Sequence, residues 1–472
     1  MTGRPARGDG LWGPRRRALT GGLVLTITLV AFEALAISTV MPDVARELGA
    51  VSSGLYGWAF TAFFLGSLIG IVVVGGAVDR RGLALPFLIG LGLFAAGLLV
   101  CGLAPSMPVL VAGRFLQGLG AGAIPPTAYV AIARSLPEAL RPRMFAMLST
   151  AWVLPGVAGP AIAGVVGDAV GWRVVFLGLL PLIALSGAVT LPAVRAVAAA
   201  PAAEQAEAAA VASLRRRVPL AIVVAAGAGL LTAAMTSGEP ALLATIGPLG
   251  LLLGLPALRR LTPPGTLRAA RGMPAAILLR GMATFAFFAV DAYVSLLLVE
   301  WRGLTLAEAG ISLTAATVSW TAGSWIQAQG SSRWAPDRFV RSGLLVVAAG
   351  IGLFSIVVLP EVPVWLAVPT FAVAGLGMGL AYAPLSLIVL RDAPPPQQGF
   401  ASSALSLSDV LGTALGTGVT GAIVAAGTRA TGGPAAGLGI GFGVAFAVAL
   451  LGTALAGRLG HTAGDGRTPA LR

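Results

Sequence analysis

Four ionisable side chains lie inside long apolar stretches of this 472-residue sequence: Glu33, Arg114, Asp291 and Asp409. A charge at the centre of a membrane-spanning helix costs about 2.5–3.5 kcal/mol on insertion scales, so each of these residues is a functional candidate. Because burial disfavours the ionised carboxyl group, Glu33 and Asp291 could take up and release protons. Two alternatives remain open: Glu33 could be a structural carboxylate that Arg114 neutralises, and Asp291 could contact a substrate.

The sequence contains an internal repeat with an offset of 257 residues. Gly118–Gly122 reads Gly-Leu-Gly-Ala-Gly, and Gly375–Gly379 reads Gly-Leu-Gly-Met-Gly. The same offset takes Glu33 to position 290, one residue before Asp291. Two related halves are a common architecture of secondary transporters.

Arg114 has no arginine at its equivalent position in the repeat, where the sequence has Phe371. The architecture therefore does not demand an arginine, which favours a functional role for Arg114. We predict that Arg114 and the two carboxylates Glu33 and Asp291 form the proton-coupling group. Asp409 could cap a helix or pair locally, and its role stays open.

Aromatic residues in the apolar stretches could line a path for lipophilic molecules and contact cations through their ring faces. Most aromatic residues in membrane proteins only pack or lie at the interface, so we expect a minority to touch substrate. The predicted substrate-binding residues are Phe32, Gln117, Trp152, Phe288, Asp291 and Trp320.

The composition is that of a membrane protein. Hydrophobic residues make up 57% of the chain and charged residues 10%, with a mean hydropathy of +0.91, whereas a soluble protein has about 25% charged residues. The apolar runs are about 20 residues long and show no period-2 alternation, so they predict helices rather than barrel strands. The net charge of +13 would suit nucleic-acid binding in a soluble protein, but its placement between apolar runs argues against nucleic acid as a partner.

The sequence offers little for catalysis or cofactor binding. Cys101 is the single cysteine, and the single histidine, His461, lies near the C-terminus. We find no phosphate-binding loop, metal-ligand cluster or nucleophile–base set. We therefore expect no enzyme activity, no metal and no cofactor.

The apolar runs predict fourteen helices in a six, two, six plan. They are expected near 18–41, 55–78, 83–104, 107–134, 143–167, 172–193, 218–235, 240–257, 273–299, 305–328, 341–359, 363–390, 400–426 and 433–457. A polar linker is expected from 195 to 217. The predicted domains are a tail at 1–17, a six-helix bundle at 18–194, a linker with an inserted helix pair at 195–272, a second six-helix bundle at 273–457 and a tail at 458–472.

Arginines gather on alternate connections between the predicted helices. They are Arg4, Arg7, Arg15, Arg16, Arg17, Arg80, Arg81, Arg134, Arg141, Arg143, Arg215, Arg216, Arg217, Arg259, Arg260, Arg268, Arg271, Arg333, Arg338 and Arg341. The positive-inside rule therefore places both termini in the cytoplasm. The absence of lysine, together with many alanines and glycines, suggests a GC-rich bacterial genome. We expect a monomer that spans the bacterial inner membrane many times.

Several segments of the first half, including Gly171–Phe176 at the entry to helix 6, resemble motifs of the major facilitator superfamily, within its fourteen-helix drug:proton antiporter branch. Gly75–Gly82 is similar to the family's signature between helices 2 and 3, although Leu83 and Ala84 replace the basic residues that usually follow. Arg114–Ala121 is similar to the helix 4 motif. Gly156–Gly164 is similar to the helix 5 antiporter motif, with Ala163 in place of a glycine.

The resemblance implies roles for these segments. Gly75, Asp79, Arg80 and Gly82 would gate the cytoplasmic side. Gly156, Gly159, Pro160 and Gly164 would let helix 5 pack closely and move against a neighbour, although simple tight packing would give the same pattern. The acid Glu33 stands nine residues before Pro42, as in the branch's helix 1 motif.

The resemblance implies an all-α fold of two six-helix bundles with a two-helix insert. It also implies proton-coupled export of a lipophilic drug, dye or secondary metabolite by alternating access, with antibiotic resistance as a consequence. The expected partners are the lipid bilayer, protons and the small-molecule substrate. An exporter of a cell-envelope lipid or glycolipid and a proton-coupled nutrient symporter remain alternatives. A membrane sensor or embedded enzyme would need a soluble domain or a catalytic set.

Overall fold

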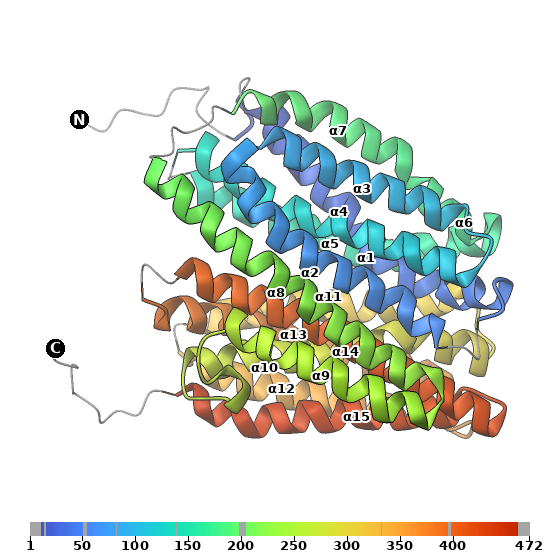
Figure 1. Cartoon of the computed structure of the whole chain (residues 1–472). Helices are drawn as coiled ribbons and strands as arrows, with labels where there is room; N and C mark the ends of the chain where they lie inside the picture. The colour runs from blue at the N-terminus through green and yellow to red at the C-terminus, as the bar shows by residue number, and fades with distance from the viewer. Residues whose placement is uncertain are drawn as a thin grey trace.

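The computed structural model describes residues 11–13, 16–50, 54–81, 83–137, 140–197, 204–331, 333–394 and 398–460. Within these residues all regular secondary structure is helical, and long helices run side by side through the molecule (Figure 1). The expectation of an all-α fold is confirmed.

The helices form two bundles and an inserted pair. The first bundle contains α1 (Arg17–Glu47), α2 (Leu55–Arg81), α3 (Ala84–Gly102), α4 (Met107–Ser135), α5 (Arg141–Val170), α6 (Trp172–Leu177) and α7 (Leu179–Arg195). The inserted pair is α8 (Glu204–Ser237) and α9 (Pro240–Leu261). The second bundle contains α10 (Met273–Ser295), α11 (Leu306–Gly330), α12 (Pro336–Ser355), α13 (Ala367–Asp392), α14 (Gln398–Thr431) and α15 (Ala435–Leu455).

Short segments complete the chain between these helices. A π-helical segment, Leu296–Trp301, continues α10. Single 3-10 turns cover Thr266–Arg268, Ile356–Val358, Val364–Leu366 and Ala456–Leu459. These segments are too short to cross a membrane alone, so they set only the ends of the crossings.

Fourteen crossings follow from these helices. In the described part of the chain, thirteen helical segments are long and apolar enough to span a membrane, with α6 and α7 joined as one. The remaining helix, α11, has 25 residues but many hydroxyl and amide side chains, including Ser312, Thr314 and Gln327. Because the number of crossings is even, both ends of the described chain lie on one side of the molecule, called here the terminal side (Figure 1). The other side is called the opposite side.

The helix boundaries differ from the expected ones at several places; α1, for example, continues to Glu47 instead of ending near 41. The expected linker at 195–217 is partly wrong, because α8 already begins at Glu204; its first residues are rich in alanine and glutamate, which favour helix. The eleventh crossing begins at Pro336 rather than at 341, since proline is well placed in the first turn of a helix. The sixth crossing is interrupted at Gly178, between α6 and α7.

The repeated glycines explain why the two halves share a sequence pattern. A side chain on Gly118 or Gly122 of α4 would collide with the α2 backbone at Phe63 or Ser67. In the second bundle, α13 approaches the α11 backbone in the same way through two glycines of the repeat, Gly375 and Gly379. Glycine is required at these positions because the backbones of the two neighbouring helices are in direct contact there.

The two bundles meet along two seams. In one seam α2 packs against α14, and in the other α5 packs against α11. The inserted α8 packs against both α2 and α14, and α9 packs on α8 (Figure 1). The insert therefore lies over the α2/α14 seam.

Candidate functional site

Glu33 and Arg114 form an ion pair inside the first bundle. Arg114 Nη1 donates to Glu33 Oε1, and the two side chains are 1% (Arg114) and 3% (Glu33) exposed. Arg114 also donates from Nε to the Ala59 carbonyl at 3.0 Å and from Nη1 to Gln117 Oε1 at 2.8 Å. Its guanidinium lies 4.4 Å from the centre of the Phe63 ring.

The site draws its groups from three helices. Glu33 comes from the middle of α1, Ala59 from α2, and Arg114 and Gln117 from one face of α4, where residues three apart are neighbours. Removing one partner of a buried ion pair typically costs about 3–5 kcal/mol, so the pair ties the three helices together while both charges are present.

Two polar atoms of this site lack a hydrogen bond. Glu33 Oε2 and Gln117 Nε2 are buried without a partner in the described structure. A buried polar atom left unsatisfied costs about 1–3 kcal/mol. The Glu33–Arg114 ion pair is thus incompletely hydrogen-bonded at one carboxylate oxygen and one amide nitrogen.

Asp291 lies elsewhere and has no arginine partner. Its side chain is partly exposed, and among the described residues it has no hydrogen-bonding or ion-pair partner. The repeat equivalent of Glu33 is Val290, which is fully buried. Because one residue along a helix turns the side chain by about 100°, Asp291 faces away from the position that Glu33 occupies in the first bundle.

Aromatic rings connect the two bundles. Phe288 of α10 lies 6.4 Å from Phe64 of α2, and Phe64 lies 5.4 Å from Phe63, the ring under Arg114. On the other side, Phe288 lies 6.5 Å from Trp320 of α11. These rings form a continuous row from the second bundle to the ion pair of the first.

A second ion pair, partly buried, was not predicted as a site. Arg280 Nε donates to Asp409 Oδ1 at 2.8 Å, and Tyr382 OH donates to Asp409 Oδ2 at 2.9 Å. Arg280 Nη1 also donates to the Tyr382 carbonyl at 2.6 Å. Asp409 therefore pairs with an arginine of α10 and a tyrosine of α13. Arg280 was not predicted as a site residue, because it follows the basic 259–271 segment and was not distinguished from it. It nevertheless lies two turns inside an apolar run.

The predicted substrate-binding residues do not form one cluster. Gln117 is fully buried and belongs to the Arg114 site. Phe288 and Trp320 share the aromatic row. Phe32 lies beside Gly159 of α5, and Trp152 of α5 is 45% exposed.

Three of the four predicted packing residues of α5, Gly156, Pro160 and Gly164, lie at the seam with α11, whereas Gly159 lies beside Phe32 of α1. A side chain on Gly156 would collide with Thr317, and one on Gly164 would collide with the backbone at Ala307. The Pro160 carbonyl lies against Gly310 of α11. The small residues thus let two helices of different bundles come close.

The predicted gating residues are only partly described. Gly75, Asp79 and Arg80 fall in the last turns of α2, but their side chains lie outside the described residues, and so does Gly82 altogether. The same holds for most of the tail at 1–17 and of the tail at 458–472.

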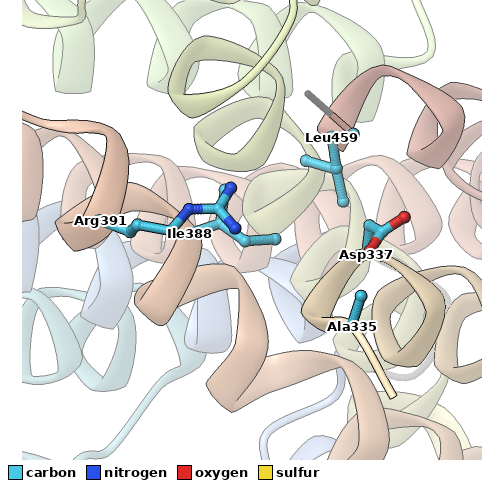
Figure 2. A pocket seen from close by; sticks show the side chains of 6 residues that line it. Ala335, Asp337, Ile388, Arg391 and Leu459 are labelled. Carbon is cyan, nitrogen blue, oxygen red and sulfur yellow. The ribbon is translucent and has the colours of Figure 1, made fainter. Parts of the chain in front are cut away.

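A pocket of about 470 Å³ lies at the terminal side of the second bundle (Figure 2). Its lining residues are Ala335, Asp337, Ile388, Arg391, Leu459 and Gly460. None of the predicted site residues lines this pocket. Its lining residues all come from position 335 onward, whereas the Glu33–Arg114 pair belongs to the first bundle.

Comparison with known proteins places this arrangement in a family. The family model described as Major Facilitator Superfamily matches residues 23–417. A probable multidrug-efflux transporter of Mycobacterium tuberculosis is 28% identical over 399 residues, which is 82% of either chain. The methylenomycin A resistance protein of Streptomyces coelicolor is 26% identical over 414 residues, covering 85% of this chain and 83% of that one.

The fold also matches solved structures. The crystal structure of a D-xylose–proton symporter covers 93% of this chain and 97% of its own, with a TM-score of 0.65 at 13% identity. The fourteen-helix organisation, the repeated glycine contacts and the match over residues 23–417 agree. The chain belongs to the Major Facilitator Superfamily and is a membrane transporter rather than an enzyme.

Proposed function

We propose that this protein exports lipophilic small molecules in exchange for protons, by alternating access between its two bundles. The observation that carries the proposal is the Glu33–Arg114 pair, which is buried, charged and left with one unsatisfied carboxylate oxygen. The drug:proton antiporter branch is the part of the family that fits these residues. Relatives described as a multidrug-efflux transporter and an antibiotic resistance protein support export of drug-like molecules.

The terminal side would face the cytoplasm of a bacterial cell. Arginines at the helix ends support this orientation, because Arg259 and Arg260 lie in the last turn of α9 on the terminal side, Arg268 follows that helix, and Arg333 follows α11 there. Both termini would then be cytoplasmic, in an inner-membrane protein that acts as a monomer.

Hydrogen bonds between the bundles on the opposite side support a state closed toward the exterior. Tyr56 OH donates to the Ala292 carbonyl at 3.2 Å, and Thr61 Oγ1 donates to the Ala414 carbonyl at 3.2 Å. Arg46 at the end of α1 pairs with Glu300 of the π-helical segment. In this state substrate would reach the protein from the cytoplasmic side.

Asp168 adds a contact between a carboxylate and backbone N–H groups on this closed side. Its two carboxylate oxygens accept hydrogen bonds from the backbone N–H groups of Leu306 at 3.3 Å and Ala307 at 3.0 Å. These groups are the first turn of α11, where the helix dipole favours a negative charge. The contact joins α5 to α11 and would have to break before the exterior side opened.

Proton exchange at Glu33 would act through Arg114. A proton on Glu33 cancels one charge of the pair, while Arg114 keeps Ala59, Gln117 and the Phe63 ring as partners. The loosened link between α1 and α4 would favour rearrangement of the bundle. One proton moving inward through 100 mV supplies about 2.3 kcal/mol, which is enough to drive modest outward accumulation.

Asp291 and the aromatic row would receive the substrate. The unpaired carboxylate of Asp291 and the ring of Phe288, one turn earlier, offer a cation both charge and a ring face. A nutrient symporter would need several polar groups arranged for one substrate, which the aromatic row does not provide. A cell-envelope lipid exporter remains the second candidate, because a lipid headgroup could also contact Asp291.

Efflux from cells tests the proposal. Cells that express the protein should export a panel of cationic and neutral dyes and antibiotics, and a protonophore should abolish the export. Export that persists with the protonophore would contradict proton coupling. Export of a nutrient alone, or of envelope lipid alone, would replace the proposed substrate class.

A further inference from the structure

The two seams between the bundles differ in what covers them. At the α2/α14 seam, α8 packs on both helices. At the α5/α11 seam, the element of the described chain that packs on both helices is α1, which is largely buried inside the protein. One seam therefore has a helix on its membrane side, and the other has none in the described structure.

The cover over the α2/α14 seam extends along most of α8. Near the opposite side, Trp58 Nε1 donates to Thr236 Oγ1 at 3.2 Å, and Thr232 lies against Gly418 of α14. Near the terminal side, the guanidinium of Arg217 lies 5.1 Å from the centre of the Phe400 ring.

Buried apolar residues fill the space between these two ends. They come from α2, α8, α9 and α14 and form one cluster, which consists of Leu65, Leu68, Ala221, Val224, Ala225, Ala228, Ala257, Leu261, Leu407, Leu411 and Ala414. This packing would keep lipid and substrate out of the α2/α14 seam.

The α5/α11 seam is close-packed on one half of its length. Toward the opposite side, Gly164 meets Ala307 and Gly156 meets Thr317. One turn nearer the terminal side on the same face of α5 stands Trp152, which is 45% exposed although Gly156 and Gly159 on that face are buried. The contact of α5 with α11 is thus seen as far as Gly156, and Trp152, one turn beyond it, is exposed.

The α11 wall of this seam combines apolar and hydroxyl groups. Thr321 stands one turn beyond Thr317 toward the terminal side and is partly exposed, and Trp325 follows after one more turn with 66% exposure. Trp320, next to Thr321, belongs to the aromatic row that reaches Phe288. The α11 wall thus carries exposed residues next to Trp320, a predicted substrate residue.

We propose that the terminal half of the α5/α11 seam, between Trp152 and Thr321, is the portal through which lipophilic cations leave the membrane leaflet, and that the insert α8–α9 seals the other seam. The proposal rests on the proposed function for its substrate class. An amphiphilic cation fits this wall, because aromatic faces accept its charge and the threonine hydroxyl offers a polar contact within an apolar surface. The insert would make substrate access one-sided.

Lipid-quenching experiments test the two seams without transport. Bimane attached at Thr321→Cys in proteoliposomes should be quenched by brominated lipids, as should a lipid-facing control at Val318→Cys. Leu68→Cys, beneath α8, should take up little label or show little quenching. Wild-type protein provides the blank, because Cys101 is buried. Strong labelling and quenching at Leu68→Cys, or none at Thr321→Cys, would overturn the proposal.

Tetraphenylphosphonium then tests the portal as a substrate route. Saturating tetraphenylphosphonium should reduce lipid quenching at Thr321→Cys but not at Val318→Cys, because only the first site exchanges lipid for substrate. Thr321→Trp should raise the KM for tetraphenylphosphonium export by about tenfold, and Val318→Trp should leave it within twofold. Equal effects at both positions would overturn the portal. If wild-type protein exports none of the dye panel, the proposed function fails, while the quenching contrast between Thr321 and Leu68 still decides which seam is open.

Discussion

At the scale of single residues, Arg114 is held by four partners from three helices. It donates to Glu33, to Gln117 and to the Ala59 carbonyl, and it lies over the Phe63 ring. The planar guanidinium can direct several donors at once, whereas a lysine ammonium is a compact point charge on a flexible stem. The geometry therefore requires arginine rather than any cation.

Arg114→Lys should fold but lose most transport. We expect export to fall roughly tenfold or more, because each lost charge-assisted hydrogen bond contributes about 1.5–3 kcal/mol. The measurement is dye efflux at matched expression, with size-exclusion chromatography to verify folding. Arg173→Lys is the control, since Arg173 also pairs with a glutamate, Glu47, but at an exposed site. Wild-type efflux by Arg114→Lys would remove Arg114 from the mechanism.

Asp291→Asn should impair the transport of cationic substrates more than the transport of neutral ones. Loss of the unpaired carboxylate removes attraction for a cation but little packing, so the KM for tetraphenylphosphonium should rise roughly tenfold while a neutral dye is exported with nearly unchanged KM. Transport assays in proteoliposomes measure both. An equal loss for both substrates would show that Asp291 serves proton coupling or folding instead.

At the scale of helices, the glycine repeat sets how closely α4 and α13 approach their neighbours. Gly375 leaves no space for a side chain next to the Ala316 carbonyl, whereas Gly443 of α15 has nothing within 4 Å of the position its Cβ would take. Both residues lie within helices, so alanine changes helix propensity in the same direction at both sites.

Gly375→Ala should therefore destabilise the protein, and Gly443→Ala should not. Overpacking of this kind costs about 1–3 kcal/mol, so we expect a lower unfolding temperature in detergent for Gly375→Ala. Gly443→Ala should match the wild type or exceed it slightly. Equal stability of the two variants would show that the α11–α13 contact relaxes without cost.

The helices were largely predictable from apolar runs and the arginine pattern, but the contacts between them were not. The length of α8 was missed because its charged first residues were interpreted as a linker, although alanine and glutamate favour helix. Arg280 was missed because a sequence does not show whether an arginine near a helix end extends to the interface or turns inward to Asp409. The role of Gln117 depended on the direction of Arg114, which only the packing of α1, α2 and α4 determines.

At the scale of the whole molecule, the bundles are joined on the opposite side by Asp168 and by Arg46 with Glu300. Asp168 caps the first turn of α11 from another bundle. The same turn has its own capping box, in which Thr305 and Glu308 bond each other's backbone groups. One helix end thus has a cap within the helix and a cap between bundles.

Asp168→Ala should shift the protein toward its exterior-open state. Losing a helix cap costs about 0.5–2 kcal/mol, which changes a two-state ratio by about 2- to 30-fold. Spin labels at Val170 of α5 and Ile311 of α11 should report a larger population at long distance. Glu308→Ala, which removes only the cap within α11, should leave the distances unchanged. Identical distributions for the two variants would contradict a role for Asp168 in closure.

The central claim is that Glu33 exchanges the proton that drives export, and substrate-induced proton release by purified protein tests it most directly. Adding tetraphenylphosphonium to weakly buffered wild-type protein should release protons, and Glu33→Gln should release none. Glu33→Gln should still bind the probe, because the amide keeps an acceptor for Arg114. It should also fail to export the probe against a gradient, whereas Glu47→Gln, an exposed change on the same helix, should behave as wild type. Wild-type proton release and uphill export by Glu33→Gln would contradict the account.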